Sequence, residues 1–139
     1  MNMLKEKNKL HHVGVVLSED KMEDVIDKFW RCGIDLGKPE CKRVDKFGCE
    51  CILFGQIELV IPDPGSKLHS WISESITPIH HIAMEVSNII ETMKEMKNSD
   101  IPVLYDEPVE GVGSTLVNFI HPLYMGFLLE IVQVVKDED

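Results

Sequence analysis

The strongest constraint on the fold is an internal repeat with a period of 69 residues. Residues 10–18, Leu-His-His-Val-Gly-Val-Val-Leu-Ser, return at residues 79–87 as Ile-His-His-Ile-Ala-Met-Glu-Val-Ser. A duplication of this kind predicts two half-domains of similar build, neither of which covers its own apolar strands alone. We therefore expect a single domain over residues 1–139. Its predicted parts are module one at about 10–64, a linker at about 65–78 and module two at about 79–135.

The hydrophobic pattern predicts the order β-α-β-β-β in each half. Each copy of the repeat is an apolar strand followed by a serine, Ser18 or Ser87, that is expected to cap a helix. In the first half this helix runs from Met22 to Trp30, with its apolar face on the core. The further predicted elements are a hairpin at residues 47–61, a helical linker at 68–76, a short edge strand at 101–104, and strands at 116–120 and 127–135.

The acidic composition argues against a nucleic-acid partner. The net charge is −10, and residues 71–139 hold 3 Lys/Arg against 12 Asp/Glu, so no cationic stripe is available for phosphates. A cluster of cations in the first half is interpreted as a solvated loop, with the docking of a small anion as the alternative. Its members are Lys38, Lys42, Arg43 and Lys46.

The sequence also bears on the cellular compartment. No stretch approaches the roughly 20 apolar residues of a membrane span, and the first nine residues lack the apolar core of a signal peptide. The four cysteines include no Cys-x-x-Cys pair, a pattern typical of reduced thiols. We therefore expect a cytoplasmic protein with no membrane contact.

Four side chains with metal-binding chemistry occupy matching places in the two copies. The second histidine of each pair is followed, 46 and 49 residues later, by a glutamate inside an apolar strand, Glu58 or Glu130. A carboxylate between large aliphatic side chains is costly to desolvate unless it is paired or binds a cation. The alternatives are a solvent-facing position for each glutamate and a satisfied core position for each histidine. Because all four recur together, the repeat favours a metal site.

Only one histidine of each pair can face a shared cavity, because neighbouring strand residues point to opposite sides. The second members, His12 and His81, each precede a Val/Ile-Gly/Ala step whose small residue lets a neighbour approach closely. Two imidazoles and two carboxylates suit a divalent ion, and Co, Ni, Zn, Mn and Fe(II) remain open. The sequence leaves open whether the ligands come from one chain or from a swapped dimer. The expected metal ligands are His12, Glu58, His81 and Glu130.

Several segments of this chain resemble the vicinal oxygen chelate superfamily, which includes glyoxalase I, methylmalonyl-CoA epimerase, extradiol dioxygenases and antibiotic-binding resistance proteins. The segments are the His-Val-Gly opening at His12, Ile-Glu-Leu at Glu58, His80–Val86, the Glu107–Pro108 loop with Gly111 and Gly113, Phe119–Pro122, and Gly126–Glu130. The likeness is greatest to methylmalonyl-CoA epimerase, over about Leu10 to Gln133. It implies an α+β fold of two paired βαβββ modules, forming a curved, partly closed mixed sheet around a metal cavity, and commonly a homodimer.

The resemblance also implies a chemistry. In this superfamily a substrate binds the ion through two neighbouring oxygens, and the carbon between them loses a proton to give a stabilised enolate. An epimerase needs a base on each face of that carbon, and a ligating carboxylate, Glu130 or Glu58, is expected to be one. The loop glutamate that resembles the second base in the epimerases is replaced here by Lys42 or Arg43, and Leu123 stands where a lysine is common.

Four functions are consistent with these residues. The first is an epimerase or isomerase acting on an acyl-CoA or another thioester, with Lys42 and Arg43 contacting a phosphate or carboxylate. The second is a glyoxalase I-like lactoylglutathione lyase, in which the ligating glutamates move the proton without a loop base. The third is a non-catalytic small-molecule binding or resistance protein, although such relatives usually lack the metal ligands. The fourth is an extradiol dioxygenase, which a second glutamate among the ligands disfavours.

His121 is a further candidate substrate contact at the cavity mouth, with a structural role as its favoured interpretation.

Overall fold

The computed structural model describes residues 9–74 and 77–135. The segment assessed above for a signal peptide lies outside these residues, apart from its last position, and so do residues 75 and 76 of the predicted helical linker. Within the described part, no helix is both long and apolar enough to cross a membrane. The chain divides into two compact units, and the boundary between them falls inside two strands, β1 (Lys9–Val16) and β5 (Ile79–Glu85). We call residues 13–80 the N-terminal unit, and residues 9–12 with 81–135 the C-terminal unit.

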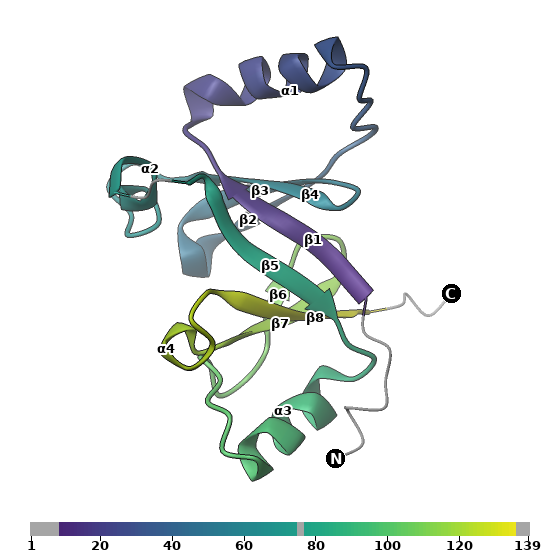
Figure 1. The fold of residues 1–139 in the computed structure, drawn as a ribbon, viewed down its shortest axis with the longest axis vertical. Helices are drawn as coiled ribbons and strands as arrows, with labels where there is room; N and C mark the ends of the chain where they lie inside the picture. Colours follow the sequence, from purple (N-terminus) through teal and green to yellow (C-terminus); the bar gives the residue numbers. More distant parts are fainter. Residues whose placement is uncertain (1–8, 75–76, 136–139) are drawn as a thin grey trace. The chain divides into compact units, whose positions relative to one another are not determined.

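The N-terminal unit holds a four-stranded sheet in the order β2-β3-β4-β1. The β1–β4 pair is parallel, whereas β2–β3 and β3–β4 are antiparallel. Helix α1 lies on one side of this sheet (Figure 1). The elements in chain order are β1 (Lys9–Val16), the 3-10 turn η2 (Glu19–Lys21), α1 (Met22–Arg31), β2 (Glu40–Val44), the 3-10 turn η3 (Asp45–Phe47), β3 (Cys49–Phe54), β4 (Ile57–Pro62) and α2 (Ser70–Glu74).

The C-terminal unit repeats this arrangement with the strand order β5-β8-β7-β6. Here the parallel pair is β5–β8, and the other two pairs are antiparallel. Its elements are β5 (Ile79–Glu85), α3 (Ile89–Asn98), β6 (Val109–Gly111), β7 (Thr115–Ile120), α4 (Pro122–Met125) and β8 (Leu129–Val134). The predicted β-α-β-β-β order is therefore confirmed in both halves, and the fold is the α+β fold expected from the sequence.

An apolar cluster fixes helix α3 against the sheet of its unit. The cluster consists of Val86, Ile89, Met96, Ile120 and Ile131, each no more than 6% exposed. Burying aliphatic side chains stabilises a fold by about 1.5–3 kcal/mol each. Ile120 lies on β7 and Ile131 on β8, so the cluster holds these two strands in place next to Glu130, which lies on β8.

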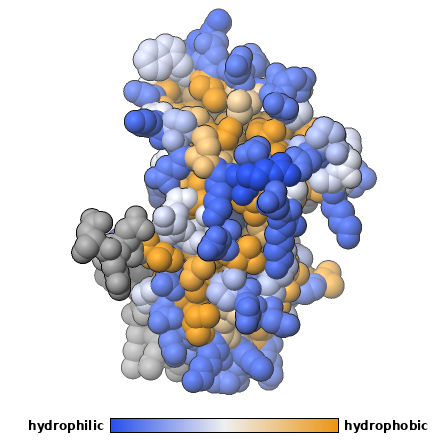
Figure 2. Space-filling model, turned by 180° about the vertical axis from the view of Figure 1, so that it is seen from behind, coloured by the Kyte–Doolittle hydropathy of each residue, from blue (hydrophilic) through white to orange (hydrophobic). Residues whose placement is uncertain are grey.

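Helix α1 is packed less deeply than α3. Met22, Val25, Ile26 and Phe29 are half-buried, as the predicted apolar face requires, but Trp30 is 67% exposed. Trp30 follows Phe29 by one residue, which turns its side chain about 100° away from that face. On the face drawn in Figure 2, apolar side chains lie interspersed among hydrophilic ones.

The structure corrects several local predictions. Ser18 makes no side-chain cap and leads into a 3-10 turn, and the cap of α3 is Asn88, which accepts a hydrogen bond from the Glu91 amide at 3.1 Å, rather than Ser87. The expected edge strand at residues 101–104 is reduced to a single bridge from Val103, because Pro102 has no N–H to donate. The prediction that the four clustered cations form a solvated loop is also wrong in part, because Lys42 and Arg43 lie in β2.

Candidate metal centre

Three of the four predicted ligands meet in the C-terminal unit. His12 lies on β1, His81 on β5 and Glu130 on β8, and they are 3%, 6% and 5% exposed. Glu130 is the parallel partner of Ala83, and His81 precedes Ala83 by two residues, so both side chains leave the sheet on the same face. Ala83 is fully buried, and its small side chain leaves room between the two ligands.

The donor atoms of these residues converge on one point. The Nε2 atoms of His12 and His81 are 3.0 Å apart, and the Oε2 atom of Glu130 lies 3.1 Å from His81 Nε2 and 3.6 Å from His12 Nε2. Two imidazole nitrogens at 3.0 Å repel each other if both present lone pairs, so either a proton or a cation lies between them. A cation at this point would accept the lone pairs of both nitrogens.

The donor set fits a divalent metal ion. Ligands at about 2.1 Å from an ion are about 3.0 Å apart at a right angle and about 3.4 Å apart at the tetrahedral angle. The three observed separations of 3.0, 3.1 and 3.6 Å correspond to such edges. A buried carboxylate beside two neutral imidazoles also leaves a negative charge that a cation would compensate.

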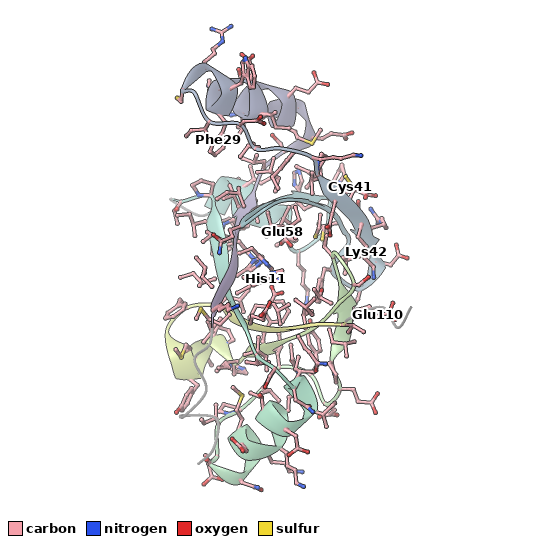
Figure 3. The ribbon with its side chains drawn as sticks, turned by 90° about the vertical axis from the view of Figure 1, so that its right-hand side faces the viewer. His11, Phe29, Cys41, Lys42, Glu58 and Glu110 are labelled. Atoms are coloured by element: carbon pink, nitrogen blue, oxygen red, sulfur yellow. The ribbon has the colours of Figure 1, made fainter. Side chains whose placement is uncertain are left out.

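The fourth predicted ligand, Glu58, belongs to the N-terminal unit. It projects from β4 (Figure 3), is 6% exposed, and is in register with Gly14 of β1 and with Leu53 of β3. The prediction that it is a buried carboxylate on a central strand is confirmed. Its role as a metal ligand stays a prediction.

Lys42 and Arg43, the predicted substrate contacts, lie on opposite faces of β2. Lys42 is in register with Cys51, which is in register with Val60. Glu58 precedes Val60 by two residues, so Glu58 and Lys42 lie on the same face of the sheet. Arg43 points to the other face, where its guanidinium pairs with both carboxylate oxygens of Asp63 and donates to Asp45 at 3.0 Å. This hydrogen bonding from Arg43 holds the pKa of the Asp63 carboxyl below its usual range. These carboxylates compete with a substrate anion for Arg43.

His121 caps a short helix. Its Nδ1 accepts a hydrogen bond from the Leu123 amide at 3.2 Å at the start of α4, which agrees with the favoured structural interpretation. Leu123 itself is 90% exposed. A role for His121 at a cavity mouth stays a prediction.

Sequence reasoning missed two pairs of polar side chains. His11, set aside in favour of His12, places its Nδ1 atom 2.7 Å from the Nδ1 atom of His12. The signal for this contact was the doubled histidine itself. The thiols of Cys49 and Cys51 lie 3.8 Å apart on β3, and the hydrogen bond from Cys51 lowers the pKa of Cys49. None of the four cysteines forms a disulfide in the structure.

Comparison with solved structures identifies proteins of the same fold. A hypothetical protein from Bacillus halodurans is 28% identical, with a TM-score of 0.77 over 96% of this chain and 99% of that one. Methylmalonyl-CoA epimerase from Mycobacterium tuberculosis is 22% identical, with a TM-score of 0.79 over 91% of this chain and 88% of that one. A Streptomyces coelicolor methylmalonyl-CoA epimerase variant in complex with 2-nitronate-propionyl-CoA is 19% identical, with a TM-score of 0.79 over 92% and 98%.

A comparison with curated proteins found no match. A family model, in contrast, matches residues 48–119, which is just over half of the 139 residues. That model describes the superfamily whose fold the solved structures share with this chain. The protein therefore belongs to the glyoxalase/bleomycin resistance protein/dioxygenase superfamily.

Proposed function

We propose that this protein is a divalent-metal-dependent enzyme that removes a proton from the carbon next to a carbonyl, in the manner of a methylmalonyl-CoA epimerase. The observation that carries the proposal is the convergence of His12 Nε2, His81 Nε2 and Glu130 Oε2 within 3.0–3.6 Å of one another in a buried position. The non-catalytic binding proteins that this chain resembles usually lack such a donor set, which favours an enzyme. The metal stays open among Co, Ni, Zn, Mn and Fe(II).

Glu58 is the fourth ligand in this proposal. The repeat supports this assignment, because the parallel strand pairs β1–β4 and β5–β8 have the same register. Glu58 is the parallel partner of Gly14, two residues after His12, just as Glu130 is the partner of Ala83, two residues after His81. Strand alternation therefore directs the side chains of His12 and Glu58 to the same face.

Glu130 is the proposed base. Both of its histidine contacts use Oε2, so we assign the other oxygen, Oε1, to take the proton from the substrate carbon. An ion shared with the Nε2 atoms of His12 and His81 would orient the carboxylate through Oε2. A bound divalent ion would stabilise the negative charge that develops on the carbonyl oxygen. Glu58 is the proposed second carboxylate for proton return, since Lys42 and Arg43 are no bases at neutral pH.

The proposed substrate is an acyl-CoA or a related thioester. A methylmalonyl-CoA epimerase neighbour is described in complex with methylmalonyl-CoA, and another with a propionyl-CoA analogue. In this chain Lys42, on the same sheet face as Glu58, is the cation that we assign to the anionic end of such a substrate. By resemblance to the superfamily we also propose that the protein is cytoplasmic and forms a homodimer. Light scattering of the purified protein tests the homodimer.

The experiment is solvent exchange at C2 of methylmalonyl-CoA. The metal-loaded protein in D₂O should incorporate deuterium at C2, and Glu130→Gln should lower the rate by about 10²–10⁴-fold, the usual contribution of a positioned base. Lys42→Gln should raise KM and leave the exchange of bound substrate nearly unchanged. An absence of exchange in the metal-loaded wild type would exclude the epimerase reaction.

One observation favours a second candidate, a glyoxalase I-like lyase. The position of the epimerase loop base is held by cations, of which Arg43 is already bound to Asp63 and Asp45. A lyase that moves its proton between the glutamates of the metal site does not need that base. Formation of a 2-hydroxyacyl thioester from methylglyoxal and glutathione, without exchange of methylmalonyl-CoA, would select this alternative.

A further inference from the structure

His11 contacts the metal-site histidine His12 through a short hydrogen bond. The two residues are neighbours on β1 (Figure 3 labels His11), and their Nδ1 atoms are 2.7 Å apart. Their rings meet edge to face, with centroids 5.0 Å apart and planes at 75°. His12 is 3% exposed and His11 is half-buried, so this bond is largely shielded from water.

The chemistry of imidazole fixes the direction of this bond once His12 ligates a cation. A neutral imidazole carries one N–H, and a nitrogen that binds a metal must present its lone pair. Because the Nε2 atom of His12 faces His81 and Glu130, its proton must then lie on Nδ1. That proton is donated to Nδ1 of His11, which accepts and carries its own proton on Nε2.

We propose that His11 is a positioning residue of the metal centre, which selects the tautomer of His12 and orients its ring toward the ion. The inference rests on the metal centre proposed above and goes beyond it by giving a role to the first histidine of the doubled pair. Residues that accept the outer N–H of a ligating histidine typically contribute 10–100-fold to metal affinity. The equivalent residue of the second copy, His80, packs its ring edge-on against Trp71 at 5.0 Å.

A matched pair of substitutions tests this role. Asn places an amide oxygen close to where Nδ1 of histidine lies, whereas Leu has the same size without an acceptor. We expect His11→Leu to bind Zn²⁺ and Co²⁺ 10–100-fold more weakly than the wild type, in competition with a chromophoric chelator. His11→Asn should stay within about threefold of the wild type, and so should His69→Leu, which removes a histidine outside the site.

The outcomes separate this inference from the proposed function. Failure of the wild type to bind either ion contradicts both the metal centre and the role of His11. If the wild type binds and His11→Leu binds within threefold of it, only the role of His11 is refuted. Should His11→Leu not fold, the nitrogen spectrum of the Zn²⁺-loaded wild type decides. A protonated Nδ1 on His12 beside an unprotonated Nδ1 on His11 supports the inference, and the reverse assignment overturns it.

Discussion

Removal of the metal ion should lower the melting temperature by about 8–14 °C. The three converging donors lie at residues 12, 81 and 130, so the site exists only when β1, β5 and β8 are assembled and the ion binds the native state alone. At a free concentration 100 times its Kd, such a ligand stabilises the fold by about 2.7 kcal/mol. For a chain of 139 residues, each kcal/mol shifts the melting temperature by about 3–5 °C.

The assay is thermal unfolding of chelator-treated protein before and after the return of Zn²⁺, Co²⁺ or Mn²⁺. Glu130→Gln is the matched variant, because it keeps the shape of the side chain and removes the charge. Its melting temperature should respond to the ions by less than about 3 °C. A wild type whose melting temperature is indifferent to both the chelator and all three ions would refute the reasoning, as would an equal response from Glu130→Gln.

Three further predictions concern stability. Asn118, which is fully buried, bonds both the amide and the carbonyl of Tyr105, at 3.2 and 2.9 Å, so Asn118→Ala should lose about 1–3 kcal/mol in urea unfolding. An added methyl at Gly111 would lie 2.6 Å from a side-chain oxygen, so Gly111→Ala should be destabilised by about 1–3 kcal/mol in the same assay. Because Arg43 holds the pKa of Asp63 down, this pair adds stability above about pH 4 that is lost as the pH falls further. The stability difference between the wild type and Asp63→Asn should therefore shrink below pH 4, and a constant difference would contradict this.

The repeat made the buried cluster of His12, His81 and Glu130 predictable. Matching positions in a duplicated strand must lie on matching faces, so the choice of His12 and His81 followed from the repeat. Their Nε2 atoms lie 3.0 Å apart, and their role as metal ligands stays a prediction. Glu130 was predictable because a carboxylate inside an aliphatic strand is costly unless it has a partner. Both arguments use periodicity and burial, which sequence carries directly.

Contacts between side chains were less predictable. Strand alternation places His11 and His12 on opposite sides, yet their Nδ1 atoms lie close enough to the backbone to meet at 2.7 Å. Arg43 was expected at a substrate, but its partner Asp63 lies 20 residues further on, and no pattern in the sequence marks that pairing. The predicted cap of α3 was wrong by one position for a related reason, since Ser87 and Asn88 are both good caps and only backbone geometry distinguishes them.

The most direct test of the metal centre is a crystal structure of the protein grown with Co²⁺ or Zn²⁺, with data collected at the absorption edge of the metal. We predict one strong anomalous peak about 2.0–2.3 Å from His12 Nε2, His81 Nε2 and the Glu130 carboxylate, with Glu58 as the fourth protein ligand. An ordered site without such a peak, or an ion bound only at other residues, would contradict the account.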